Sequence, residues 1–363
     1  MTVLKKLAEN IWEIEKEGKM NVPITIFASE LLLEKIKQDK TIQQAQNMAS
    51  MRGLAGYIIV LPDAHQGYGA CIGGVAAYDA EKGVISPGEI GYDIGCGVRL
   101  LITSLQREEF LNKRKEILQE IYKNIPSGVG KESEFTLDDK ELNQVLEKGV
   151  QWAVEKGYAT KEDQQRIEDN GCILGADASK VSPRAKARGR SQLGSLGSGN
   201  HFLEIQEVEQ IFDKETAKAF GLKSGQIVVM IHSGSRGLGH QVASDYIMKM
   251  EKQYGFKDLP DRELICAPIN SPLGKDYRAA MAAAANFAFA NRQLMTYQVR
   301  KSFAKFFPKV KIALLYDIAH NIAKFEEHQV NEKSCTLCVH RKGATRSFGP
   351  GRKEIPTIYR ALG

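Results

Sequence analysis

Asp93 and Cys96 stand three residues apart in the run GEIGYDIGCGVRL at 88–100, among four glycines. A carboxylate and a thiolate surrounded by glycines are typical metal ligands. Four further segments combine histidine with small or polar neighbours: LGSGNHFLEI at 196–205, IHSGSRGLGH at 231–240, YDIAHN at 316–321 and CVHRKGATR at 338–346. Together these segments predict an enzyme.

The histidines, taken as a set, predict a metal centre. The chain has seven, and four of them stand at or beside the end of an expected strand. These four are His65, His201, His232 and His320. A single histidine in such a place is usually a hydrogen-bonded structural residue, but four beside Asp93 and Cys96 are hard to explain independently.

The metal and the number of ions stay open at this point. The candidate ligands are Asp93, Cys96, His201, His232 and His320. Five donors exceed the set that one catalytic zinc uses, so either two ions share the thiolate or one ion leaves histidines spare. Thiolate and imidazole donors favour zinc, because manganese lies at the weak end of the affinity series.

Two segments have the residues to hold phosphate. His340 is followed by Arg341, Lys342 and Arg346 around small residues, and we expect this run to have an open backbone. Cations there would hold a triphosphate while a neutral imidazole attacks phosphorus. Arg236 and the glycines of HSGSRGLG would hold another phosphate. Both segments suggest a substrate with a phosphorylated nucleic acid end.

Composition limits the class of protein. The chain has 363 residues, of which 43% are hydrophobic and 26% charged, as in folded globular proteins. Its net charge of +6 leans toward a polyanionic partner. The six irregularly spaced cysteines suit reduced thiols, and no apolar run reaches the roughly 18 residues of a membrane span. We expect a cytoplasmic protein without a membrane partner.

In the first half of the chain, we expect strands next to Asp63 and Cys96. Apolar periodicity predicts a helix over 29–51, a strand over 57–62 that ends just before Asp63, and a strand over about 98–104. Between 106 and 170, two amphipathic patterns at 108–125 and 141–158 predict a helical scaffold insertion without chemistry of its own.

The second half continues with mixed elements. The segment 177–199 concentrates five cations and then glycine and serine, which predicts a flexible basic loop; it either follows a phosphate backbone or is a solvated surface. Strands are expected over 225–236 and 309–321, with one helix after GLGHQ and an alanine-rich helix over 276–306 between them. Because no regular βαβ period or internal repeat is present, we expect an α+β fold.

The ordered blocks DAHQGYG, GYDIGCGVR, GSGNHFLEI, HSGSRGLGHQ, AHN and VHRKGATR resemble the signature blocks of the RNA-splicing ligase RtcB family. The resemblance extends from about residue 20 to residue 363. It implies a complex mixed-sheet single catalytic domain with helical layers over 1–363. The chain stops soon after the last block, at PTIYRALG, so we expect it to lack the C-terminal part of the family fold, which includes a guanine-pocket loop.

The resemblance also implies a reaction. It is that of a GTP- and Mn²⁺-dependent ligase that joins an RNA 3′-phosphate, or a 2′,3′-cyclic phosphate after opening, to a 5′-hydroxyl through a GMP-histidine intermediate. Such a ligase acts in tRNA splicing or RNA repair, on tRNA halves for example, and can use an archease-type activator. Two alternatives remain: a metal-dependent phosphoesterase acting on RNA ends, and an inactive RNA-binding fragment of a ligase.

Site roles follow from the same resemblance. Asp93, Cys96, His201, His232 and His320 match the ligands of two Mn²⁺ ions, with Cys96 bridging. His340 matches the histidine that becomes guanylylated, and Asp63 a carboxylate that orients it. The positions that match nucleotide contacts are Asn200, His201, Phe202, Leu203, Glu204, His320, Asn321, His340, Arg341, Lys342 and Gly343.

Overall fold

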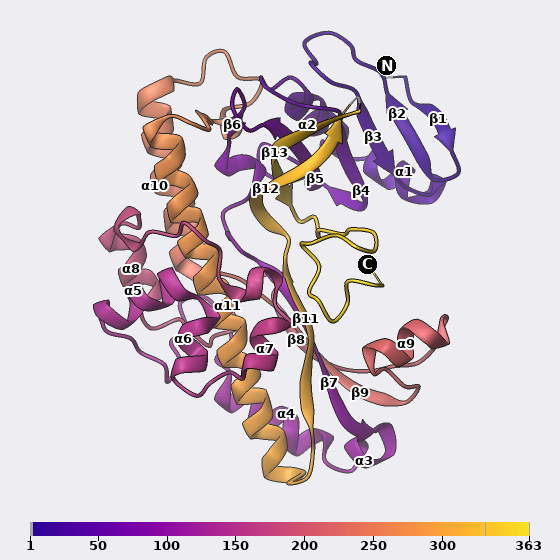
Figure 1. Cartoon of the computed structure of the whole chain (residues 1–363), viewed down its shortest axis with the longest axis vertical. Helices are drawn as coiled ribbons and strands as arrows, with labels where there is room; N and C mark the ends of the chain where they lie inside the picture. The colour runs from indigo at the N-terminus through magenta and orange to yellow at the C-terminus, as the bar shows by residue number, and fades with distance from the viewer. Residues whose placement is uncertain (1–2, 331, 363) are drawn as a thin grey trace. The chain divides into compact units, whose positions relative to one another are not determined.

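Strands and helices alternate irregularly along the chain in the computed structural model, which describes residues 3–330 and 332–362 (Figure 1). The chain divides into a first unit, Met1–Ile94, Val242–Ala279 and His320–Arg346, and a second unit, Gly95–Gln241, Ala280–Ala319 and Ser347–Gly363. The mixed sheets and their helices confirm the predicted α+β class. A single catalytic domain over 1–363 stays a prediction.

The first unit contains a seven-stranded sheet in the order β1-β2-β3-β4-β5-β13-β12. Neighbouring strands are antiparallel except for β3 and β4, which are parallel. The strands are β1 Lys5–Ala8, β2 Ile11–Ile14, β3 Ile24–Phe27, β4 Ile58–His65, β5 Ile72–Asp79, β12 Asn321–Val330 and β13 Lys333–Lys342; β6 Val84–Ile85 and β10 Ala267–Pro268 form a separate pair. Since β13 lies between β5 and β12, its residues from 337 to 342 have backbone partners on both sides.

The helix predicted over 29–51 is two helices, α1 Glu30–Ile36 and α2 Thr41–Ala49. Ser29 caps α1, because its hydroxyl accepts a hydrogen bond from the Leu32 N–H. The break follows from Asp39, whose carboxylate accepts hydrogen bonds from the backbone N–H and the hydroxyl of Thr41. An aspartate that satisfies a backbone donor in this way starts a new helix and ends the previous one.

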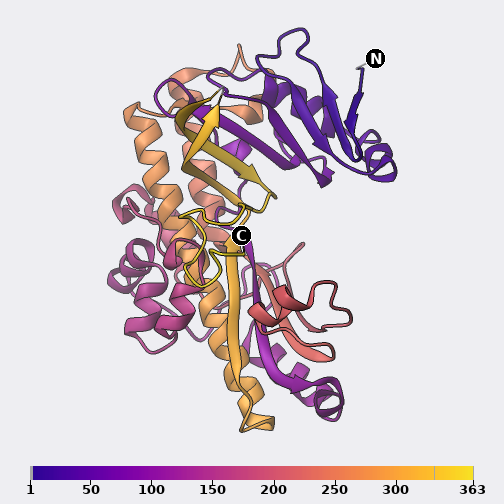
Figure 2. The same ribbon diagram turned by 45° about the vertical axis from the view of Figure 1, so that its right-hand side comes forward.

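The second unit contains an antiparallel sheet in the order β11-β7-β9-β8. Its strands are β7 Gly97–Gln106, β8 Phe202–Glu207, β9 Gln226–Ser233 and β11 Ile312–Ala319. The long helix α11, Pro272–Phe306, runs along this sheet in both views (Figures 1 and 2). Most side chains of α11 beyond residue 279 are buried on every face, as expected of a helix enclosed within a core.

Short helices pack around the second unit: α5, α6 and α7 lie beside α11, whereas α3 packs against β7 and β9 (Figure 1). They are α3 Arg107–Leu111, α4 Arg114–Asn124, α5 Asp139–Lys148, α6 Val150–Glu155 and α7 Lys161–Gln165. The helices predicted over 108–125 and 141–158 are therefore present, each broken into two. Their description as an insertion within a single domain stays a prediction.

The basic segment 177–199 contains a helix, which corrects the prediction of a flexible loop. Helix α8, Pro183–Gly189, has Ser182 as its N-cap, with the hydroxyl accepting from the Ala185 N–H at 3.1 Å, and proline at its first position. Serine followed by proline is a typical helix start, but the five cations of this segment suggested a loop instead. Two of the cations also have partners, Arg188 with Gln241 and Arg190 with Asp139.

The remaining helices complete the chain. They are α9 Lys214–Phe220 and α10 Arg236–Tyr254, with single turns η1 Pro87–Glu89, η2 Glu168–Gly171, η3 Ala178–Lys180 and η4 Arg262–Leu264. Over residues 3–330 and 332–362, none of the helices combines the length and apolar character that crossing a bilayer requires.

Candidate metal centre

Three predicted ligands meet at one edge of the four-stranded sheet. Cys96 immediately precedes β7, His201 immediately precedes β8, and His232 is the penultimate residue of β9. Since β9 runs antiparallel to both neighbours, the end of β9 lies beside the starts of β7 and β8. The topology of the sheet therefore gathers three residues that are far apart in the sequence.

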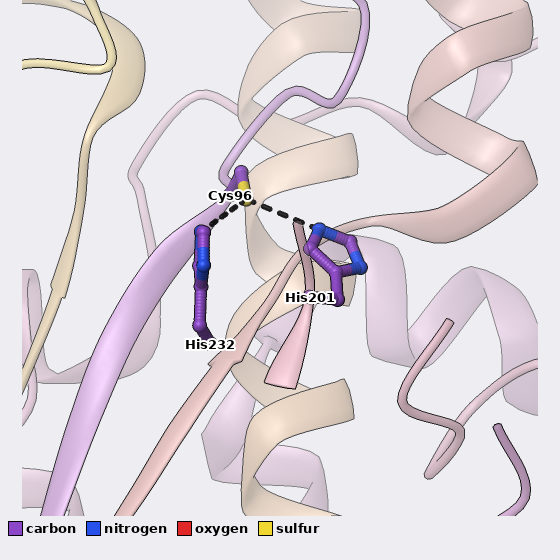
Figure 3. A group of neighbouring side chains, drawn as sticks. All are labelled: Cys96, His201 and His232. Carbon is purple, nitrogen blue, oxygen red and sulfur yellow. Dashed lines mark hydrogen bonds between the residues drawn. The ribbon is translucent and has the colours of Figure 1, made fainter. Parts of the chain in front are cut away.

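The three side chains are in contact through the atoms that bind metals. Cys96 Sγ lies 3.3 Å from His201 Nε2 and 3.2 Å from His232 Nε2, and all three atoms lie within 4.8 Å of one another. Both imidazole rings turn their Nε2 edges toward the sulfur (Figure 3). Cys96 and His232 are buried and His201 is half-buried, so the cluster is largely removed from water.

The separations fit a divalent metal. Ligand atoms bound to one tetrahedral zinc, at the usual Zn–S and Zn–N lengths, lie roughly 3.5 Å apart. The two sulfur-to-nitrogen distances are close to this value. One thiolate with two imidazoles is a donor set for zinc or another borderline metal, and it leaves a position for water or substrate.

A hydrogen bond on the far side of His201 prepares its ring for a metal. Its Nδ1 lies 3.1 Å from the carbonyl oxygen of Leu196. When Nδ1–H donates to this carbonyl, the lone pair of a neutral ring is on Nε2, the nitrogen that faces Cys96. The guanidinium of Arg236 lies 3.2 Å from the same Nδ1, so this cation borders the cluster.

Two glycines allow Cys96 to reach its place. Gly95 has a φ of +73°, and a Cβ on it would lie 2.7 Å from the Cα of Ala285 on α11. A Cβ on Gly97 would lie 2.2 Å from the Ile318 carbonyl oxygen on β11. Side chains at either position would push the Cys96 backbone away from α11 or β11, which gives the GCG sequence a steric reason.

Asp93 and His320, the other predicted ligands, belong to the first unit and are described there. The backbone carbonyl of Asp93 accepts a hydrogen bond from Asn321 Nδ2 at 3.2 Å. Asn321 Oδ1 accepts from the Gly343 N–H at 2.8 Å, and the His320 carbonyl accepts from the Ala344 N–H. Asn321 thus joins the DIG and KGA segments, whereas its predicted nucleotide contact stays a prediction.

The expected open backbone around His340 is not observed. His340 lies within the interior strand β13 and is completely buried. Its Nε2 accepts from the Ser86 N–H at 3.2 Å, its ring packs edge-to-face on Tyr78 with centroids 4.9 Å apart, and burial lowers its pKa to about 4. The sequence was misleading because basic neighbours at 341 and 342 suggested a surface loop.

The neighbouring cations are also engaged. Arg341 donates two hydrogen bonds to Glu326, at 2.6 and 3.0 Å, within the β12–β13 hairpin. Lys342 Nζ donates to the carbonyl oxygens of Gly88, at 2.9 Å, and Tyr68, and burial lowers its pKa to about 8. The expected open loop is therefore corrected to a core hairpin, whereas the nucleotide contacts predicted for Arg341 and Lys342 stay predictions.

Other predicted contact residues lie near the cluster or on the surface of the first unit. Phe202 stands opposite His232 in the β8–β9 pair, with ring centroids 5.3 Å apart. Asn200 and Glu204 are exposed and Leu203 is half-buried. In the first unit, Asp63 is an exposed residue of β4, and the bonding partners described for His340 do not include it. Their nucleotide and orienting roles stay predictions.

Sequence reasoning missed several buried polar residues. Asn291 and Arg292 on α11 bond to the segments that carry the cluster, and Glu89 accepts hydrogen bonds from the hydroxyl of Tyr78. The pKa of Glu89 is raised to about 7 by burial. The sequence does indicate the buried polar residues of α11, because the polar run at 291–293 interrupts an otherwise alanine-rich and aromatic stretch.

Comparisons with known proteins identify the family of this chain. The family model of the tRNA-splicing ligase RtcB matches residues 44–363. The chain belongs to the RtcB family. The tRNA-splicing ligase RtcB of Nanoarchaeum equitans is 52% identical over 365 residues, which cover 99% of this chain and 76% of the relative. Those of Aeropyrum pernix and Pyrobaculum aerophilum are 52% and 53% identical and are covered over 78% and 76% of their lengths.

Family membership confirms the resemblance predicted from the ordered blocks. The RtcB relatives are longer than this chain, which spans about three-quarters of their lengths. Within the shared part, the RtcB family model includes Cys96, His201 and His232.

Proposed function

We propose that the protein is a GTP- and Mn²⁺-dependent RNA ligase that joins a 3′-phosphate, or an opened 2′,3′-cyclic phosphate, to a 5′-hydroxyl, as in tRNA splicing or RNA repair. Its class, an RNA ligase enzyme, follows from full-chain identities of about 50% to named ligases. The observation that carries the proposal is the cluster of Cys96, His201 and His232 in a chain of this family.

The cluster would hold the metal that the reaction needs. Cys96 as thiolate, with His201 and His232 through Nε2, supplies three donors at suitable separations. A divalent ion held by these residues would neutralise charge that develops on a phosphate during transfer. Donor softness favours zinc, whereas the family resemblance implies manganese, so both metals belong in the test. A second ion with Asp93 and His320 as further ligands stays a prediction.

Three residues beside the cluster would support the metal and its substrate. The Leu196 carbonyl is an acceptor for a proton on His201 Nδ1, and Arg236 places a positive charge beside the cluster. A guanidinium at this position can bind a phosphate of the RNA end or of the nucleotide through paired hydrogen bonds. Phe202 packs against the ring of His232, with ring centroids 5.3 Å apart.

A GMP-histidine intermediate is part of the proposal, and its position needs a direct test. The sequence predicts His340, but both ring nitrogens have partners and the ring is enclosed. His340 could attack phosphorus only if the Ser86 contact opened. His340 as the residue that becomes guanylylated stays a prediction.

The experiment combines ligation with mapping of the label. The purified chain is incubated with α-labelled GTP, Mn²⁺ or Zn²⁺, and RNA with a 3′-phosphate and a 5′-hydroxyl, and any labelled peptide is identified by mass spectrometry. We expect joined RNA in wild type and none in Cys96→Ser. Removal of the 3′-phosphate without joining would support the phosphoesterase, and salt-sensitive RNA binding without chemistry would support the inactive fragment.

A further inference from the structure

Asn291 of α11 joins two segments of the second unit through its side-chain amide. The side chain is completely buried. Its Oδ1 accepts hydrogen bonds from the N–H groups of Gly194, at 2.7 Å, and Ser195, at 3.2 Å. Its Nδ2 donates to the carbonyl oxygens of Ser195, at 3.2 Å, and Gly234, at 3.0 Å, and approaches the Ser233 hydroxyl at 3.2 Å.

One of these segments contacts a ligand of the candidate metal centre, and the other directly follows one. Residues 194–196 end on Leu196, whose carbonyl is the acceptor for Nδ1 of His201. Ser233 and Gly234 directly follow His232, and the Ser233 hydroxyl donates to the same Leu196 carbonyl at 2.7 Å. Asn291 therefore fixes the backbone behind both histidines.

Arg292, the next residue of α11, does the same for the cysteine. Its Nη1 donates to the carbonyl oxygens of Gly95 and Ser233, each at 2.8 Å. Gly95 directly precedes Cys96, so one nitrogen joins the backbone beside the thiol to the backbone beside His232. The other guanidinium nitrogens bond to Asp317, which holds the fork in this orientation.

We propose that Asn291 and Arg292 are positioning residues of the metal centre: together they hold the backbone beside Cys96 and His232 and the segment whose Leu196 carbonyl faces His201. The proposal rests on the proposed function only in taking the Cys96 cluster as a metal site. Residues that orient metal ligands from outside the coordination sphere typically change metal affinity by about 10- to 100-fold when removed.

A comparison within α11 separates positioning from general support of the fold. Asn286 is equally buried, and its amide donates to the Leu146 carbonyl at 3.0 Å and accepts from the Ile173 N–H at 2.7 Å. Neither Leu146 nor Ile173 adjoins Cys96, His201 or His232 in the chain. Asn286→Ala therefore removes the same kind of buried amide without touching a ligand-bearing segment, and it is the matched control for Asn291→Ala.

The test measures metal affinity and ligand geometry directly. Co²⁺ is titrated into wild type, Asn291→Ala, Arg292→Lys and Asn286→Ala, and the thiolate-to-cobalt absorption is followed in competition with a chelator. We expect Co²⁺ affinity to fall by about 10- to 100-fold in Asn291→Ala and Arg292→Lys, with a changed absorption band, and to stay within about threefold of wild type in Asn286→Ala. Circular dichroism compares the folded content of the four proteins.

The proposal is overturned if Asn291→Ala and Asn286→Ala bind Co²⁺ with the same affinity and spectrum, or if wild type shows no thiolate band. If Asn291→Ala does not fold, Arg292→Lys carries the test, because lysine keeps a positive charge beside Asp317 and loses the planar fork that joins Gly95 and Ser233. A wild type that binds Co²⁺ through Cys96 but joins no RNA would contradict the proposed ligase and leave the positioning result standing.

Discussion

Gly97 of β7 lies so close to Ile318 of β11 that a Cβ on the glycine would lie 2.2 Å from the Ile318 carbonyl oxygen. The two residues belong to the strands that form the middle and one edge of the four-stranded sheet. Because Gly97 directly follows Cys96, the close approach of the two strands also determines where the thiol lies.

We predict that Gly97→Ala lowers both stability and metal affinity. The added methyl group has to displace backbone, and overpacking of this kind costs about 1–3 kcal/mol in the free energy of unfolding. Urea denaturation and Co²⁺ titration measure the two effects. Gly349→Ala is the control, because no atom lies within 4 Å of the Cβ it would add. Equal stability of the two variants would contradict the steric role of Gly97.

Replacing Cys96 should remove the metal. In Cys96→Ser the sulfur donor becomes a hydroxyl, which binds these metals poorly, so the loss of affinity should exceed the 10- to 100-fold change expected from residues outside the coordination sphere. Metal content after dialysis, measured by mass spectrometry, and ligation are the readouts. Cys335→Ser, at a half-buried cysteine of β13, should keep both. Retention of metal by Cys96→Ser would exclude the thiol as a ligand.

The burial of His340 makes the stability of the protein depend on pH. Its pKa is about 4 in the folded protein, below the usual histidine value of 6.5, so the unfolded chain binds more protons between these values. The free energy of unfolding should therefore fall as pH decreases from 6.5 through 4, by about 3 kcal/mol from this group.

Glu89 has the opposite effect on how stability depends on pH. Comparing wild type with a His340 variant separates the two effects. Its pKa of about 7 lies above the usual glutamate value of 4.5, so it favours the folded state as pH falls from 7 to 4.5. Urea unfolding of wild type and His340→Phe across pH 4–7 isolates the histidine, because Glu89 is present in both. Parallel profiles would show that His340 does not remain neutral in the folded protein.

Asp317 should be a strong determinant of stability. Its carboxylate bonds to Arg99 at 2.6 Å and to Arg292 at 2.7 Å, and all three side chains are completely buried. Asp317→Asn leaves two guanidinium groups buried without their counter-charge, which costs about 3–5 kcal/mol in the free energy of unfolding. Chemical denaturation measures this loss. Glu120→Gln, in a surface pair with Lys305, should change stability little, and a similar effect of both substitutions would count against the burial argument.

The salt dependence of RNA binding decides between the two interpretations of the basic segment. Arg184 and Lys186 lie on α8, and the double change Arg184→Gln/Lys186→Gln should lower the slope of log affinity against log salt by about 0.7 for each lost contact with single-stranded RNA. Fluorescence anisotropy at several salt concentrations measures this slope. The control is Lys214→Gln/Lys218→Gln on α9. Equal slopes in wild type and the α8 variant would indicate a solvated surface.

Much of the fold was accessible from the sequence because strands and long helices have strong periodic signals. The strand expected at 98–104 is β7, and the alanine-rich helix expected at 276–306 is α11. Short helices were harder to place, because their boundaries depend on single side chains such as Asp39, whose hydrogen bonds to Thr41 divide one expected helix into two.

The site was predictable where residue type and strand position coincide. Residue types and neighbours predict Cys96, His201 and His232 as ligands, and the antiparallel order of β7, β9 and β8 brings the three side chains together, while their role as ligands stays a prediction. His340 shows the limit of this reasoning. Its basic neighbours have buried partners, Glu326 among them, that lie elsewhere in the sequence, so composition alone suggested a surface where the structure has a core.

The wide spacing of the cluster along the chain links metal supply to folding. Cys96 is separated from His201 by 105 positions and from His232 by 136, so an unfolded chain cannot offer the three donors together. An ion bound there would stabilise only the native state, by about 1.4 kcal/mol for each tenfold rise in its free concentration above the dissociation constant. A cell short of this metal would hold less of the protein in its folded form, and a chelator would lower its melting temperature.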